Sequence, residues 1–206
     1  MAPPALSARV NESFTASTHD GMSPLESPRL ATFSSPQRKT QAASVPATLL
    51  SATLPADADP RLRHLHDYWR SVHPPGGGLP GRQHIDPCAM VPLLRWIWMM
   101  DVERDPLRFR YRLVGTEQVN VMGRDFTGRR LDEVHEHFLT SVSHSQYVTS
   151  VERGEIGYLK GAPPYHVTRD YMQVERLLVP LARNGRDVDI LLALTVYLQP
   201  ARPRAL

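Results

Sequence analysis

The stretch RFRYRLVGTEQVNVMGRDFTGRRLDEV, residues 108–134, decides the fold because its periodicity changes part-way along. Its first residues alternate between apolar and basic side chains, which is the two-residue period of a half-buried strand. We expect the apolar set to point inward and the basic set outward. The following TEQVNVMG predicts a short helix that ends at Gly123, since glycine commonly closes a helix. The apolar set is Phe109, Tyr111 and Leu113, and the basic set is Arg108, Arg110 and Arg112.

The glycines of this stretch raise the alternative of a loop that cradles phosphate. Such a loop needs GxGxxG spacing, or a glycine followed by Lys and then Ser or Thr, at the start of a helix. Neither spacing is present around Gly115, Gly123 or Gly128. We therefore interpret these glycines as the ends of a strand, a helix and a loop.

Further strands are expected on both sides of this stretch. The first pairs antiparallel with the alternating strand across Asp105-Pro106. The last two are joined at Asn184-Gly185, a strong hairpin signal because both residues tolerate a positive φ. The predicted strands are 97–103, 107–115, about 165–168, 172–182 and 187–198.

Two helical segments lie between the strands or just ahead of them. The helix that begins at Asp86-Pro87 must be short or kinked, because Pro92 interrupts it. The longest helical pattern runs over residues 129–155 and places an apolar stripe on one face. This stripe consists of Leu131, Val134, Phe138 and Val142.

An amphipathic helix is predicted over residues 58–73, ahead of the loop HPPGGGLPG. Asp59 followed by Pro60 is a good helix start. A helix of this length is marginal alone in water, so its apolar stripe must be buried. The stripe packs either on its own domain or on a second copy of the chain, with Trp69 as the central anchor of a homodimer. Its residues are Leu62, Leu65, Trp69 and Val72.

The beginning of the chain has a different composition. Residues 1–57 are rich in Ala, Ser, Thr and Pro and have no sustained hydrophobic period. Such a segment buries too little apolar surface to offset its ordering entropy, so we predict a disordered tail. The expected organisation is a tail over 1–57, one domain over 58–200 and a short tail over 201–206.

Composition and charge narrow the functional classes. The net charge is +3, and acids and bases are interspersed, as in RRLDEVHEH, so we expect no nucleic-acid partner. No apolar run approaches the roughly 18 residues of a membrane span, so we expect no membrane partner. Cys88 is the only cysteine, which precludes an intrachain disulfide and fits the cytoplasm.

The predicted order is helix, helical turn, two strands, helices and three strands. It indicates an α+β fold with a five-stranded antiparallel sheet, in which the helices follow the second strand. Seven motifs between about residues 62 and 198 carry a further signal. They are Tyr68-Trp69, Leu79-Pro80-Gly81-Arg82, Ile85-Asp86-Pro87, Arg110-Tyr111-Arg112-Leu113-Val114-Gly115-Thr116, Gly123-Arg124-Asp125-Phe126-Thr127-Gly128, Leu178-Val179-Pro180-Leu181 and Asn184-Gly185. Together they make the chain resemble the PAS fold, and in detail a bacterial family of small single-PAS proteins, from which only Pro92 departs.

The resemblance implies a non-catalytic sensory or regulatory module that binds a small apolar ligand, an unidentified signalling partner, or both. Related PAS domains often dimerise through a flanking helix, which agrees with the predicted homodimer. Two alternatives are a pure interaction module without a ligand and a small enzyme that uses Tyr111, His135 or Glu175 as an acid or base. We expect seven inward residues to line the cavity between sheet and helices. They are Tyr111, Leu113, Met122, Phe126, Phe138, Leu177 and Val179.

No metal site is expected, and the resemblance points to no particular cofactor. His135 and His137 point to different sides of their predicted helix, and no Cys or His spacing fits zinc. The flavin-adduct cysteine of light-sensing PAS domains lies in an Asn-Cys-Arg-Phe type of motif, which is absent. A haem would need an axial histidine, for which His135 is the only candidate. The arginine row at 108, 110 and 112 is either an ion-paired surface or a docking surface for an acidic partner.

Overall fold

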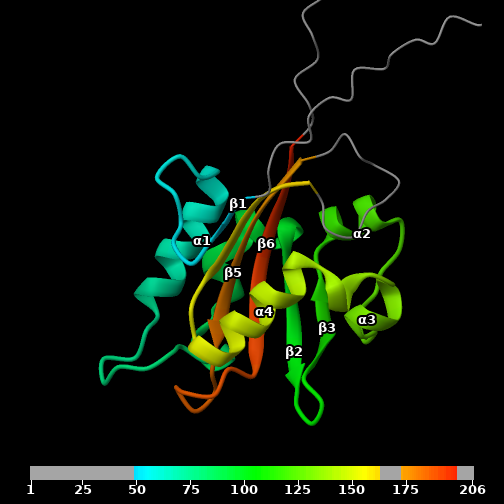
Figure 1. Cartoon of the computed structure of the whole chain (residues 1–206). Coiled ribbons are helices and arrows are strands. Elements are labelled where there is room, and N and C mark those ends of the chain that lie inside the picture. The colour runs from blue at the N-terminus through cyan, green and yellow to red at the C-terminus, as the bar shows by residue number, and fades with distance from the viewer. Residues whose placement is uncertain (1–48, 163–172, 199–206) are drawn as a thin grey trace, which may run out of the picture. The chain divides into compact units, whose positions relative to one another are not determined.

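The computed structural model describes residues 49–162 and 173–198, and these form one antiparallel sheet with helices on both faces (Figure 1). The strand order is β1-β4-β5-β6-β2-β3. Figure 1 shows α1 and α4 on opposite sides of β5. The helical elements are α1 (Pro60–Ser71), η1 (Arg82–His84), η2 (Pro87–Trp96), α2 (Thr116–Met122), α3 (Leu131–Val134), η3 (Phe138–Thr140) and α4 (Val142–Arg153). The strands are β1 (Leu49–Ser51), β2 (Ile97–Glu103), β3 (Arg108–Val114), β4 (Gly157–Gly161), β5 (Gln173–Leu181) and β6 (Ile190–Leu198).

Strands β2 to β6 confirm the predicted five-stranded antiparallel sheet, and the helices α2 to α4 follow the second of these strands. Gly123 ends α2 in the left-handed conformation, as its position in the sequence predicted. The helix that contains Pro92 is a 3₁₀ segment with a kink at Met90, which agrees with the expected interruption. The α+β fold class was thus predicted correctly.

The two faces of the sheet carry separate hydrophobic cores, because both faces are covered. We call the face under α2, α3 and α4 the helical face, and the opposite one the α1 face. Successive residues of β5 and β6 alternate between the two, so Leu177 and Leu192 lie on the α1 face while Leu178 and Leu191 lie on the helical face. This arrangement explains why both strands read as nearly continuous apolar runs.

The N-terminal helix α1 packs on its own sheet, which is the first of the two alternatives for its stripe. Leu62 and Leu65 are completely buried, and Trp69 Nε1 donates a hydrogen bond to the Pro180 carbonyl at 3.0 Å. Val72 packs against the same core. The α1 face of the sheet is apolar, and α1 covers it within one chain. Leu62, Leu65 and Trp69 are therefore buried in their own domain, while Val72 is partly exposed.

The alternation predicted for β3 fails at its end. Met99 pairs with Leu113 and Met100 pairs with Tyr111, so Arg112 is an extra residue in a β-bulge. A bulge shifts the following side chains to the other face. Leu113 is consequently 43% exposed instead of buried.

The prediction of one long helix over residues 129–155 is wrong, because the segment is divided into α3, η3 and α4. His135 leaves the helical conformation after α3. The Ser141 side chain accepts a hydrogen bond from the His144 N–H and begins α4 anew. N-caps of this kind favour a new helix start over continuation of the old one.

Two strands lie where the sequence did not predict them. β1 pairs with β4 although it falls within the segment predicted as a tail, so the sheet includes residues 49–51. β4 precedes the Gly161–Pro164 break, whereas a strand was expected after it. The expected strand at 165–168 and residues 1–48 lie outside the described residues.

Candidate functional site

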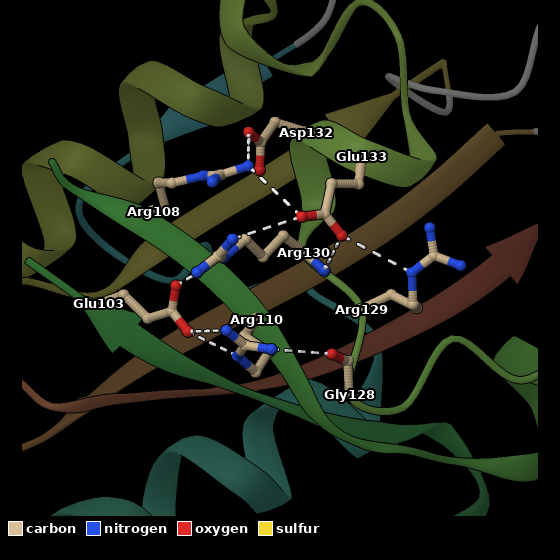
Figure 2. Close-up of polar contacts among 8 residues, drawn as sticks. All are labelled: Glu103, Arg108, Arg110, Gly128, Arg129, Arg130, Asp132 and Glu133. Carbon is tan, nitrogen blue, oxygen red and sulfur yellow. Dashed lines mark hydrogen bonds and ion pairs between the residues drawn. The ribbon is translucent and has the colours of Figure 1, made fainter.

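The row of arginines on β3 lies in an ion-pair network with β2 and α3 (Figure 2). Figure 2 shows Glu103 between Arg110 and Arg130, and Arg130 Nε donates to Glu103 Oε2 at 2.7 Å. Hydrogen bonds from Arg130 and Arg110 lower the pKa of Glu103. Arg108 pairs with Asp132 at the start of α3.

The network also includes Glu133, which is 3.6 Å from Arg108 and 3.4 Å from Arg130. Outside it, Arg112 pairs with Asp101 of β2 at 2.9 Å. All three arginines of the row are therefore paired with carboxylates of this chain. This agrees with the ion-paired interpretation of the row and leaves little free positive charge for an acidic partner.

The seven predicted cavity residues do not converge. Tyr111, Phe126 and Phe138 are buried together on the helical face, and Met122 packs against them. Leu177 and Val179 lie on the α1 face instead, and Leu113 is turned outward by the bulge. The sequence did not reveal the orientation of β5, because both faces of that strand are apolar.

Aromatic rings fill much of the helical face. Tyr111 stacks on Phe126 with centroids 6.1 Å apart, and Trp98 lies 5.9 Å from Tyr111. Phe109 makes edge-to-face contacts with Phe138 at 5.9 Å and with Tyr147 at 5.4 Å. Edge-to-face and offset pairs of this kind stabilise a core beyond the area that they bury.

A buried pair of polar groups lies within this aromatic core. The Tyr111 hydroxyl and His135 Nε2 are 3.0 Å apart, and His135 is only 9% exposed. Tyr111 and His135, two of the three candidate acid-base residues, are thus in direct contact. The third, Glu175, lies on the opposite face of the sheet.

Arg176 of β5 is a second buried polar group on the helical face, and the sequence analysis missed it. It is only 3% exposed. Its guanidinium donates to the Tyr147 hydroxyl at 2.8 Å, to Ser143 Oγ at 3.0 Å and to Gln146 Oε1 at 2.8 Å. All three acceptors belong to α4. An arginine inside the apolar run QVERLLVPL was the available signal, because charged residues are seldom placed in a fully buried strand.

Two further polar pairs lie on the same face. Trp98 Nε1 donates to Thr195 Oγ1 at 2.9 Å, and the Tyr197 hydroxyl donates to Gln118 Oε1. Gln118, on α2, is 5% exposed. The helical face therefore carries donors and acceptors from α2, α4 and four strands in an otherwise apolar core.

The order of the strands and the position of the helices after the second strand agree with a comparison to known protein families. A family model described as a PAS domain matches residues 58–195. The chain belongs to the PAS domain family. This confirms the resemblance found in the sequence, and PAS membership indicates a sensory or regulatory signalling module.

The PAS domain is also similar to one chain of a solved structure titled "Structure of an RNA-binding Light-Oxygen-Voltage Receptor". The identity is 14% and the TM-score is 0.36, over 73% of this chain and 37% of that chain. No curated protein shows significant sequence similarity to this PAS domain.

On the α1 face of the PAS domain, Glu175 is a buried carboxylate with a structural role. Its Oε1 accepts hydrogen bonds from the Asp59 N–H at 2.8 Å and from the Tyr158 hydroxyl at 2.9 Å. Lys160 Nζ lies 3.7 Å from its other oxygen. Burial and the neighbouring Glu175 raise the pKa of Tyr158. Glu175 thus fixes the beginning of α1 on the sheet.

Other candidate sites in the PAS domain are modest. A surface pocket of about 320 Å³ lies between α4 and the β1–β4 edge, with Gln146 and Gly157 in its lining. Cys88 is an exposed thiol in the first turn of η2.

Within residues 49–162 and 173–198, no three His, Cys, Asp or Glu side chains are grouped to hold a metal ion. In the same ranges, no helix has the length and apolar character needed to cross a membrane.

Proposed function

We propose that this chain is a non-catalytic sensory PAS module that binds a small ligand on its helical face and passes the signal to a partner protein. The observation that carries the proposal is the set of polar side chains buried in that face. Burying such groups costs free energy, whereas an apolar core of the same shape would stabilise the fold at least as well. A binding role accounts for their presence.

The proposal includes contact with a partner protein and a homodimer. The buried stripe of α1 is not the surface that we propose for these contacts. Exposed apolar side chains on described elements offer other surfaces. Val91 and Leu94 lie on one side of η2, with 61% and 40% exposure, and Leu113 is exposed on the edge strand β3. Ligand binding would act on such surfaces through α2 and α4, which carry side chains of the helical face.

Native mass spectrometry of the purified full chain tests the proposal. We expect a species heavier than the polypeptide by the mass of a small molecule, which acid denaturation releases. Adding the released molecule back to stripped protein should slow amide hydrogen exchange in α2 and α4 more than in α1. Absence of any bound species, together with no change in exchange on adding a cell extract, would favour the pure interaction module.

The small enzyme is the second candidate, and the Tyr111–His135 pair is the observation that favours it. A hydroxyl hydrogen-bonded to a buried imidazole can hold or move a proton. Incubating the released molecule with the protein separates the two functions. We expect its mass to remain unchanged over hours, with wild type and with Tyr111→Phe alike. Turnover that is lost in Tyr111→Phe would establish catalysis.

A further inference from the structure

Arg176 has an unused hydrogen-bond donor in the core of the helical face. A guanidinium carries five N–H groups, and three hydrogen bonds to α4 occupy three of them. Nε is buried and has no hydrogen-bond partner in the part of the chain that the structure describes. Each acceptor supplied by the described residues is neutral, and the Tyr147 ring adds a contact with its centroid 4.9 Å from the guanidinium carbon. Within residues 49–162 and 173–198, the groups that contact this positive charge are therefore neutral dipoles.

The nearest acid in sequence does not neutralise Arg176. Glu175 is the adjacent residue, and adjacent residues of a strand point to opposite faces. Its carboxylate is occupied on the α1 face by Asp59 and Tyr158. A buried charge with no opposite charge beside it destabilises a fold in general, so stability alone does not favour an arginine here.

Gln118 provides a second unused donor over the same strands. Its Oε1 accepts a hydrogen bond from the Tyr197 hydroxyl, while its Nε2 is buried and has no partner among the described residues. Arg176 is paired in register with Thr195, and Tyr197 lies two residues further along the same face of β6. Burial raises the pKa of Tyr197, and the charge of Arg176 opposes this shift, which agrees with their proximity. Both of these donors thus lie on the helical face, Gln118 on α2 and Arg176 on β5 beneath α4.

We propose that these two donors receive the carboxylate of a small organic acid. This rests on the proposed function, since it assigns a ligand class to the helical face. One carboxylate would supply both missing acceptors and the missing negative charge. The neighbouring rings of Trp98 and Tyr147 favour an aryl or alkyl body. Three of the five guanidinium donors are already used, which favours a monocarboxylate over a phosphate with more oxygens to satisfy.

Matched acids and amides test the assignment on the full chain. The probes are phenylacetate and hexanoate, each compared with its own neutral amide by calorimetry and thermal melting. We expect at least one of the acids to bind wild type and to raise its melting temperature, while the amides do not. Arg176→Gln should weaken acid binding about tenfold or more, the usual effect of a lost charge-assisted hydrogen bond. Arg183→Gln, at a side chain that is 83% exposed, is the matched control and should bind as wild type does.

Further variants keep the test decisive if Arg176→Gln folds poorly. Arg176→Lys retains the charge without the planar donors, and Gln118→Leu removes the second donor together with the acceptor of the Tyr197 hydroxyl. Both should weaken the acid several-fold and leave the amides unaffected. Amides that bind as tightly as the acids would overturn the carboxylate assignment while leaving ligand binding intact. Failure of both acids to bind folded wild type would overturn it as well, and the native-mass measurement would then judge the proposed function separately.

Discussion

Trp69 combines packing with a specific hydrogen bond. Its ring fills the core between α1 and the sheet, packs against His73 edge-to-face at 4.4 Å, and its N–H is satisfied by the Pro180 carbonyl. Buried indoles usually need such an acceptor, because an unsatisfied N–H would offset part of the gain from burial.

We predict that Trp69→Ala lowers the free energy of unfolding by about 3–5 kcal/mol, the usual cost of a large cavity. Urea denaturation followed by circular dichroism measures this. Arg70→Ala, at an exposed neighbouring position of the same helix, is the control and should change stability little. A native mass that falls in Trp69→Ala while stability is retained would restore the interface interpretation.

The bulge in β3 leads us to expect different effects on stability from substitutions at Leu113 and at Phe109. Leu113→Thr should change the unfolding free energy by less than about 0.5 kcal/mol, since the side chain is exposed. Phe109→Ala, three pairs away on the same strand, should cost about 3–5 kcal/mol, because Phe109 is buried. The same denaturation measurement compares them. A large loss in Leu113→Thr would contradict the register Met99–Leu113.

At the scale of elements, α1 depends on the Asp59 cap. Asp59 Oδ1 accepts hydrogen bonds from the Arg61 backbone N–H and from Arg61 Nε, both at 2.9 Å. The hydrogen bond from the Arg61 side chain is the main cause that lowers the pKa of Asp59 below its ordinary value of 3.8. A lowered pKa means that the charged carboxylate stabilises the folded state.

The stabilisation by Asp59 is therefore present above pH 3.8 and is lost as the pH falls through the folded pKa. We predict that Asp59→Asn, which keeps a capping oxygen, flattens the dependence of stability on pH below about pH 4. Asp59→Ala should cost about 1 kcal/mol at neutral pH. Denaturation curves at several pH values measure both effects. An acid slope for Asp59→Asn equal to that of wild type would contradict the pKa shift.

Elements whose limits depend on their own residues were predicted from the sequence. Features that depend on contacts with other elements were not. The Gly123 stop and the bounds of β2 follow from residues inside the element. The bulge at Arg112 depends on the pairing of β2 with β3, which no single strand encodes. In the site, the ring of Tyr111 was predicted from alternation. Arg176 was missed because a strand that is apolar on both faces gives no sign of which face is which.

At the scale of the whole domain, the short segment ahead of α1 belongs to the fold. β1 pairs with β4, Leu54 packs against the α1-face core, and the Ala56 carbonyl accepts a hydrogen bond from Arg63 at 2.7 Å. Because of these contacts, we expect removal of residues 49–57 to destabilise the domain.

We predict that deleting residues 1–48 leaves the melting temperature within about 2 °C, because their composition offers little apolar surface to bury. Deleting 1–57 should lower it by about 4–8 °C, corresponding to about 2 kcal/mol of lost packing and pairing. Calorimetry of both truncations beside the full chain measures the difference. Equal melting temperatures for the two would contradict a stabilising role for β1.

Glu175 and Arg176 share one peptide bond, yet one holds the start of α1 and the other holds α4. A displacement of β5 along its length therefore moves both anchors together, because the backbone between them cannot stretch. Motion that begins among the helices on one side arrives at the first turn of α1 on the other side, without any side chain crossing the sheet. Strand β5 therefore couples the position of α4 on one side of the sheet to the position of α1 on the other.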